Sequence, residues 1–229
     1  MMLAALLLAA LGAADLVRRP GGRTHVLEVP FLTALAVFVL GAAALGFGRE
    51  GIWVAVPAMA VVVAWLSAQT AARLYGLITG AAAVAAALLF GQHVPRHEPP
   101  IEPWYDSLEI PALQSVPLDA AVLGLAVVVF LVQSANVVVR AVLRKAGPAV
   151  LEEEQELQGG RILGPIERVF IFAMALAGQY AAVAAVMAAK GVLRFPEISR
   201  DAAGGSRAEY VLVGSFVSWA LAFAAVPLF

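Results

Sequence analysis

The chain has 229 residues, of which 62% are apolar and only 14% are charged, whereas soluble domains average about 45–50% apolar and about 25% charged residues. The net charge is −1 and cysteine is absent, which excludes disulfides, thiolate nucleophiles and cysteine metal sites and leaves no basic surface for nucleic acid. The apolar residues gather in long runs, so we predict an all-α, polytopic helical membrane protein that contacts membrane lipids. We expect no cofactor.

The first apolar run, residues 2–17, opens the chain. No Lys or Arg precedes it, so we interpret it as a retained first helix and not as a signal peptide. The run is short for a span of roughly 20 residues. We therefore expect Asp15 and the arginines after it to lie at the membrane surface.

Runs of about 17 to 25 apolar residues predict seven transmembrane helices. They fall at 2–17, 30–48, 52–69, 73–92, 118–143, 165–192 and 209–228. The polar interval 67–73 between the third and fourth runs is thin, and it fits either a tight hairpin or one long bent helix.

These runs divide the chain into three parts. The parts are N-terminal helices one to four at 1–92, an external loop rich in Pro and acidic residues at 93–117, and C-terminal helices five to seven at 118–229, with an acidic inner connector at 147–160.

The distribution of Lys and Arg over short loops predicts the orientation. With the N-terminus outside, nine basic residues fall on the inner side: Arg18, Arg19, Arg23, Arg73, Arg140, Arg144, Lys145, Arg161 and Arg168. Six fall on the outer side: Arg49, Arg96, Lys190, Arg194, Arg200 and Arg207. This bias, together with Trp104 and Tyr105 in the 93–117 loop, predicts a multi-pass protein of the cell membrane with its N-terminus outside and its C-terminus inside.

The fifth run carries a polar stripe. Gln133, Asn136, Arg140 and Arg144 follow one another at intervals of three, four and four, which places them on one face of an α-helix. Amides that face lipid cost free energy, so the stripe should face other helices or a water-filled cleft. Two interpretations stay open: helix packing with arginines that reach the headgroups, and a path for a substrate.

The sixth run, 165–192, carries charges at both ends. Glu167 and Arg168 form an ion-pair candidate at the inner end, where we expect Glu167 to neutralise Arg140 or Arg144. Lys190 and Arg194, spaced i,i+4 at the outer end, form a two-cation patch that suits a phosphate or carboxylate. The same patch could instead pair with Glu197, with Glu209 or with the acidic outer loop.

A metal site is not expected. His93 and His97 have the i,i+4 spacing of metal ligands on a helix, but Pro95 lies between them and Pro99 follows, which argues against that helix.

Ordered motifs in the last third add a resemblance. Glu167-Arg168, Gly178-Gln179-Tyr180, Ala188-Ala189-Lys190 and Glu209-Tyr210 stand within about residues 159–218. This stretch resembles the C-terminal helices of an uncharacterised bacterial integral membrane protein family, for which no activity is established. The resemblance implies that these motif residues share a site: Glu167, Arg168, Gln179, Tyr180, Lys190, Arg194 and Glu209.

Three functions follow as hypotheses. The first is binding or transport of an anionic amphiphile or small anion by Lys190 and Arg194, with Gln179, Tyr180 and Glu209 beside them. The second is a structural or assembly subunit, as a homo-oligomer or in a membrane complex, because the glycines of 41–48 and 76–80 permit close helix approach. The third is a membrane enzyme for a lipid-linked substrate, with Glu167 or Glu209 as acid or base.

Overall fold

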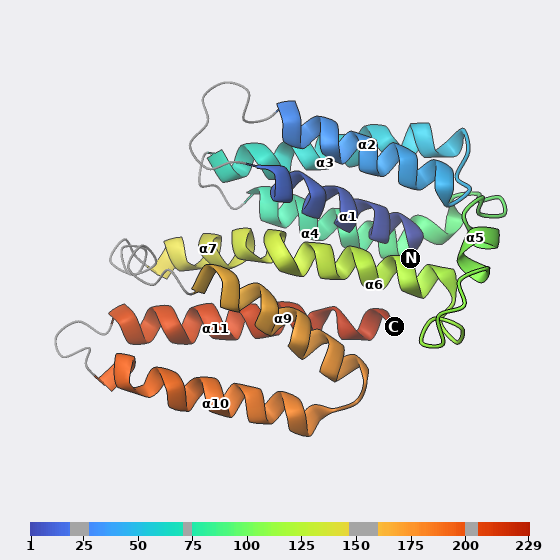
Figure 1. Ribbon diagram of the computed structural model, residues 1–229. Coiled ribbons are helices and arrows are strands. Elements are labelled where there is room, and N and C mark those ends of the chain that lie inside the picture. Colours follow the sequence, from blue (N-terminus) through green and yellow to red (C-terminus); the bar gives the residue numbers. More distant parts are fainter. Residues whose placement is uncertain (19–27, 71–74, 147–159, 200–205) are drawn as a thin grey trace. The chain divides into compact units, whose positions relative to one another are not determined.

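A computed structural model describes residues 1–18, 28–70, 75–146, 160–199 and 206–229, and these residues form helices and connections without any strand. The all-α prediction is therefore confirmed. The chain divides into two compact units, Met1–Ser134 and Ala135–Phe229, and Figure 1 shows the helices of each.

The first unit is built around its first helix. Its elements are α1 (Met2–Val17), α2 (Glu28–Ala44), α3 (Glu50–Thr70), α4 (Tyr75–Phe90), η1 (Gly91–His93), α5 (Glu102–Asp106), α6 (Leu118–Val129) and the π-helical turn η2 (Phe130–Ser134). Helix α1 packs against α2, α3, α4 and α6, and 12 of its 16 residues are buried. A helix that is apolar on all sides is suited to this central position.

Successive long helices of this unit run in opposite directions (Figure 1). Helices α3 and α4 are separate and pack against each other, which decides between the two interpretations of the interval 67–73 in favour of a hairpin. Residues 71–74 themselves lie outside the described residues.

The second unit contains α7 (Ala135–Ala146), α9 (Gly160–Leu176), α10 (Tyr180–Ser199), α11 (Ser206–Ala224) and η3 (Val226–Leu228). Helix α11 packs against α7, α9 and α10. The acidic connector predicted at 147–160 lies, except for Gly160, outside the described residues, and so do the side chains of Arg194 and Glu209.

The predicted single helix at 165–192 is wrong. Helix α9 ends at Leu176, and α10 begins at Tyr180. Between them Gly178 has a φ of 70°, the N–H of Gly178 bonds to the carbonyl of Ala175, and the N–H of Gln179 bonds to the carbonyl of Met174. This pair of bonds around a left-handed glycine is the Schellman termination of a helix. The two helices pack together and run in opposite directions (Figure 1).

Three helices of the described chain are long and apolar enough to cross a membrane: Glu50–Gln69, Tyr75–His93 and Leu118–Arg144. The third includes α6, η2 and most of α7, so it corresponds to the predicted run 118–143. Shorter apolar helices occupy Met2–Val17, Glu28–Ala44, Tyr180–Leu193 and Leu212–Leu228. A membrane protein is therefore supported, while the predicted number of seven spans is not confirmed.

Candidate functional site

Polar side chains from α7, α9, α10 and α11 meet in one cluster, which we call the C-terminal cluster. Its members are Asn136 of α7, Glu167 and Arg168 of α9, Lys190 of α10, and Ser218 and Trp219 of α11.

The carboxylate of Glu167 binds two of these side chains. The Lys190 Nζ donates to Oε2 at 2.5 Å, and the Trp219 indole N–H donates to Oε1 at 2.8 Å. The Lys190 ammonium also lies 5.4 Å from the centre of the Trp219 ring, within the range of a cation–π interaction. The Glu167 side chain is 6% exposed and that of Lys190 is 19% exposed. The ion pair is therefore largely buried within the protein, and Lys190 is its more exposed member.

Arg168 is the largest fully buried side chain among the described residues, with 2% of its surface exposed. Its Nη1 donates to the hydroxyl of Ser218 at 3.1 Å, and its Nη2 donates to Oδ1 of Asn136 at 2.6 Å. The forked guanidinium can reach two helices at once. Because successive residues of a helix differ by about 100° in direction, Arg168 turns towards α7 while Glu167 turns towards α10.

The cluster lies away from the helix ends. Glu167 follows the first residue of α9 by seven positions, about 10 Å of helix, and Lys190 follows the first residue of α10 by ten positions, about 15 Å. Both charges thus lie several turns inside their helices, and charges inside membrane-spanning helices are candidates for functional sites.

The structure corrects the predicted partners of these charges. We expected Glu167 to pair with Arg140 or Arg144. Its hydrogen-bonded ion pair is formed with Lys190 instead. The expectation of two charged sites at opposite ends of one helix is wrong as well, because the turn at Gly178 brings Lys190 back beside Glu167.

The other predicted ligand residues lie elsewhere. Gln179 and Tyr180 are exposed at the turn between α9 and α10, about 15 Å along α10 from Lys190. Arg194 belongs to α10 and Glu209 to α11, but their side chains lie outside the described residues.

The polar stripe is only partly present. Gln133 lies in the π-helical turn η2 and not in an α-helix, so the four residues do not share one continuous α-helical face. Asn136 joins the C-terminal cluster, while Arg140 is half-buried and Arg144 is exposed.

Three members of the cluster were missing from the predicted set of ligand and ion-pair residues: Asn136, which was assigned to the stripe, Ser218 and Trp219. Ser218 and Trp219 are polar residues inside an apolar run, and that position is the signal that sequence reasoning could have used.

The first unit holds a second cluster that sequence reasoning missed. Asp15 is 2% exposed and lies among the packed helices of this unit, while its place at the membrane surface stays a prediction. Its carboxylate accepts hydrogen bonds from Trp65, Gln69 and Ser134. These side chains come together because of the register between three helices, which the sequence of a single apolar run does not show.

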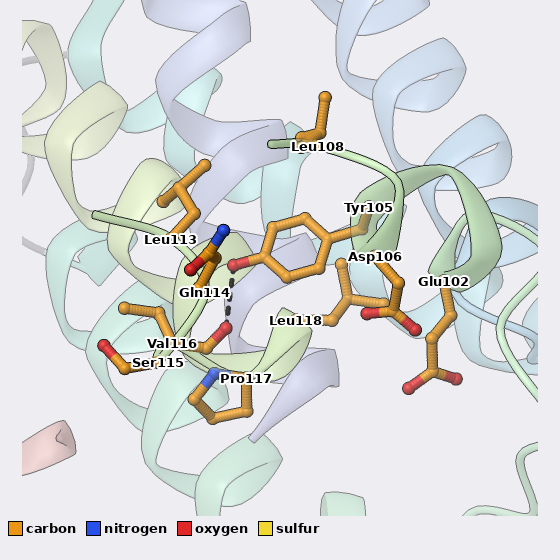
Figure 2. Close-up of a pocket in the computed structure, with 10 residues that line it drawn as sticks. All are labelled: Glu102, Tyr105, Asp106, Leu108, Leu113, Gln114, Ser115, Val116, Pro117 and Leu118. Atoms are coloured by element: carbon orange, nitrogen blue, oxygen red, sulfur yellow. Dashed lines mark hydrogen bonds between the residues drawn. The ribbon is translucent and has the colours of Figure 1, made fainter. Parts of the chain in front are cut away.

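A pocket of about 410 Å³ lies in the first unit around α5 and the segment that follows it. The Tyr105 hydroxyl donates to the carbonyl of Val116 at 2.8 Å (Figure 2). The two acidic residues that line this pocket, Glu102 and Asp106, are exposed, so the pocket provides no buried charge. Within the described residues no three His, Asp or Glu side chains gather as metal ligands.

No protein-family model matches the chain, and no similar protein was found among curated proteins or solved structures. The resemblance of residues 159–218 to an uncharacterised membrane protein family therefore stays a prediction.

Proposed function

We propose that this protein is a multi-pass membrane protein that binds or transports an anionic amphiphile or small anion at the C-terminal cluster. The observation that carries the proposal is the Lys190 ammonium, a cation at the more open edge of a polar cluster inside an apolar helical unit.

The Lys190 ammonium has N–H donors that Glu167 does not use. An ammonium group has three N–H donors, and within the described residues one acceptor, Glu167, binds it. An acidic group that arrives at this edge can take a second donor while Glu167 keeps the first. Arg168 adds a positive charge next to Glu167 in the chain, so the electrostatic potential at this edge favours an anion.

The orientation proposed for the chain follows from the turn at Gly178. If α1, α2, α3, α4, the helix Leu118–Arg144, α9, α10 and α11 each cross the membrane, the N- and C-termini lie on the same side. With both outside, 11 of the 15 basic residues fall on the inner side: Arg18, Arg19, Arg23, Arg73, Arg140, Arg144, Lys145, Arg161, Arg194, Arg200 and Arg207. Arg49 and Arg96 fall outside, while Arg168 and Lys190 lie within helices.

This distribution follows the positive-inside rule more closely than the seven-helix prediction, which places nine basic residues inside and six outside. Arg194, Arg200 and Arg207, which the seven-helix prediction places outside, lie on the inner side if α9 and α10 cross the membrane separately. We therefore propose that the N-terminus stays outside, as first predicted, and that the C-terminus is outside as well.

Binding is tested with a double variant that removes both charges of the ion pair. Lys190→Gln alone would leave the Glu167 carboxylate buried without its cation, which is strongly destabilising. In Glu167→Gln/Lys190→Gln the new amide at position 167 can still accept the Trp219 N–H. Purified wild-type protein should retain an anionic phospholipid or inorganic phosphate in native mass spectrometry, and the double variant should lose at least tenfold in affinity.

The matched control is Arg96→Gln, which removes a cation from a part-exposed ion pair with Asp119 and should bind as the wild type does. A zwitterionic phospholipid serves as the uncharged ligand. Equal retention of the anion by the wild type and a folded double variant would contradict the proposal and would leave the cluster a packing role, as expected of an assembly subunit.

A further inference from the structure

The second cluster surrounds Asp15, the one acidic residue of α1. We call it the N-terminal cluster, formed by Asp15, Arg18, Trp65, Gln69 and Ser134. Oδ2 of Asp15 accepts the Trp65 indole N–H at 3.0 Å and the Ser134 hydroxyl at 2.6 Å. Oδ1 accepts the amide N–H of Gln69 at 2.9 Å.

The donors that reach this carboxyl group are neutral. Arg18, three residues after Asp15, donates to Oε1 of Gln69, and its positive charge also acts on the carboxyl group. Asp15 is 2% exposed and Ser134 is fully buried. A charge so deeply buried normally has a directly bonded counter-ion, whereas the bonds that the described residues give this carboxyl group come from uncharged groups.

Close helix approach produces the cluster. Gly12 lies one turn before Asp15 on the same face of α1, and a Cβ there would lie 2.7 Å from Cγ1 of Val129 and 3.1 Å from the backbone carbon of Val129. The glycine thus lets α1 approach the junction of α6 and η2. Ser134 is the last residue of the π-helical turn η2, and π-helical turns are frequent at functional sites.

Among the described residues, few other charged or titratable groups lie at this end of the unit. Besides Arg18, the described residues place Glu28 at the start of α2 and Tyr75 at the start of α4, where its hydroxyl is bonded to Ser67 at 2.9 Å. The remaining titratable groups of the elements that pack on α1 belong to the opposite end (Figure 1): Glu50, His93 and Asp119.

Ser134 makes the cluster compatible with an added proton. The N–H groups of Trp65 and Gln69 can only donate in this geometry, whereas a serine hydroxyl both donates and accepts. With a proton on Oδ2, that oxygen donates to Oγ of Ser134 while Trp65 and Gln69 keep their bonds. The serine hydroxyl then donates to a carbonyl of the preceding helical turn, as serines in helices do.

We propose that Asp15 is a proton-binding site within the membrane part of the protein, at which the Ser134 hydroxyl changes from donor to acceptor when the proton binds. The ligand is a single proton, and the site lies in a different unit from the C-terminal cluster. The inference does not depend on anion binding.

Infrared difference spectroscopy of the full protein in lipid vesicles tests the site. We expect the carbonyl band of a buried protonated carboxyl group to change with pH in the wild type and to vanish in Asp15→Asn. The matched control Asp119→Asn, whose side chain is 46% exposed and paired with Arg96, should keep the band. In Ser134→Ala the band should persist at a shifted frequency, because the protonated group has lost its acceptor.

A second measurement needs no variant. A hydrophobic carbodiimide modifies protonated carboxyl groups, and peptide mapping of the wild type should locate one adduct at Asp15 that decreases as pH rises. If Asp15→Asn does not fold, isotopic ¹³C labelling of aspartate assigns the infrared band to an aspartate, and the peptide map of the adduct identifies which one. No pH-dependent aspartate band across the folded pH range, or a band that survives in folded Asp15→Asn, would overturn the proposal.

Discussion

Gly178 shows how one residue determines where distant charges meet. Its φ of 70° is a backbone conformation that glycine adopts without cost and that other residues avoid. Because α9 ends there, the chain reverses, and Lys190 packs beside Glu167. Without the reversal, a continuous helix would separate Glu167 and Lys190 by 23 positions, about 35 Å.

Gly178→Ala should therefore lower stability through the backbone alone. A Cβ at position 178 meets nothing within 4 Å, so the cost is that of a left-handed alanine, about 1 kcal/mol. Gly191→Ala is the matched control, because that position is equally open but lies within α10 and should gain up to about 1 kcal/mol of helix propensity. Unfolding in detergent, followed by circular dichroism, measures both, and equal stability of the two variants would contradict the role of the turn.

The ion pair makes a separate prediction at Lys190. Lys190→Gln leaves the Glu167 carboxylate buried with Trp219 but without its cation, which should cost about 3 kcal/mol. Glu167→Gln/Lys190→Gln should lie within about 1 kcal/mol of the wild type, because neutral groups of similar size replace a buried pair at little cost. Denaturant titration of both variants checks the order, and a single variant as stable as the double one would show that the pair is not coupled.

Among the elements, the α3–α4 hairpin shows what small residues do in this chain. A Cβ at Gly76 would lie 2.3 Å from Cβ of Ala68 and 2.8 Å from the carbonyl oxygen of Ala64. At Gly80 a Cβ would lie 2.9 Å from the Trp65 ring. The glycines of 76–80 thus serve close packing within the chain and hold α4 against the tryptophan that binds Asp15.

Gly76→Ala should destabilise the first unit. Its neighbours at Ala68 and Ala64 are a Cβ and a backbone oxygen, which cannot move aside as the tip of a flexible side chain can, so overpacking should cost about 1–3 kcal/mol. The same Gly191→Ala variant serves as control. A Gly76→Ala protein with unchanged thermal unfolding would mean that α3 and α4 separate without cost.

Helix positions could be predicted from the sequence where length and hydropathy decide them, as in the runs 52–69 and 73–92 that became α3 and α4. The end of α9 at Leu176 could not be predicted, because a single glycine in an apolar run can either end a helix or allow close packing within one. The partners of Asp15 and Glu167 could not be predicted either. They depend on the register between helices, and hydropathy does not record register.

For the whole molecule, the number of membrane crossings decides the side on which the C-terminal third begins and ends. The predicted run 165–192 counted as one crossing, whereas the orientation that we propose counts α9 and α10 as two. The Gly178 turn then lies opposite the basic segment between α10 and α11. In the orientation that we propose, this segment, which contains Arg200, lies on the inner side, as the positive-inside rule favours.

Single cysteines test this orientation directly, because the natural chain has no cysteine that would have to be removed. A membrane-impermeant maleimide applied to intact cells should label Gln179→Cys at the turn and a cysteine added after Phe229, both outside. It should label Arg200→Cys only after the cells are opened. Gln114→Cys, in the segment proposed as external and exposed in the structure, is the positive control for outside labelling. The alternative with one crossing at 165–192 predicts the reverse for Arg200 and for the C-terminus, so labelling of Arg200→Cys in intact cells would reject eight crossings.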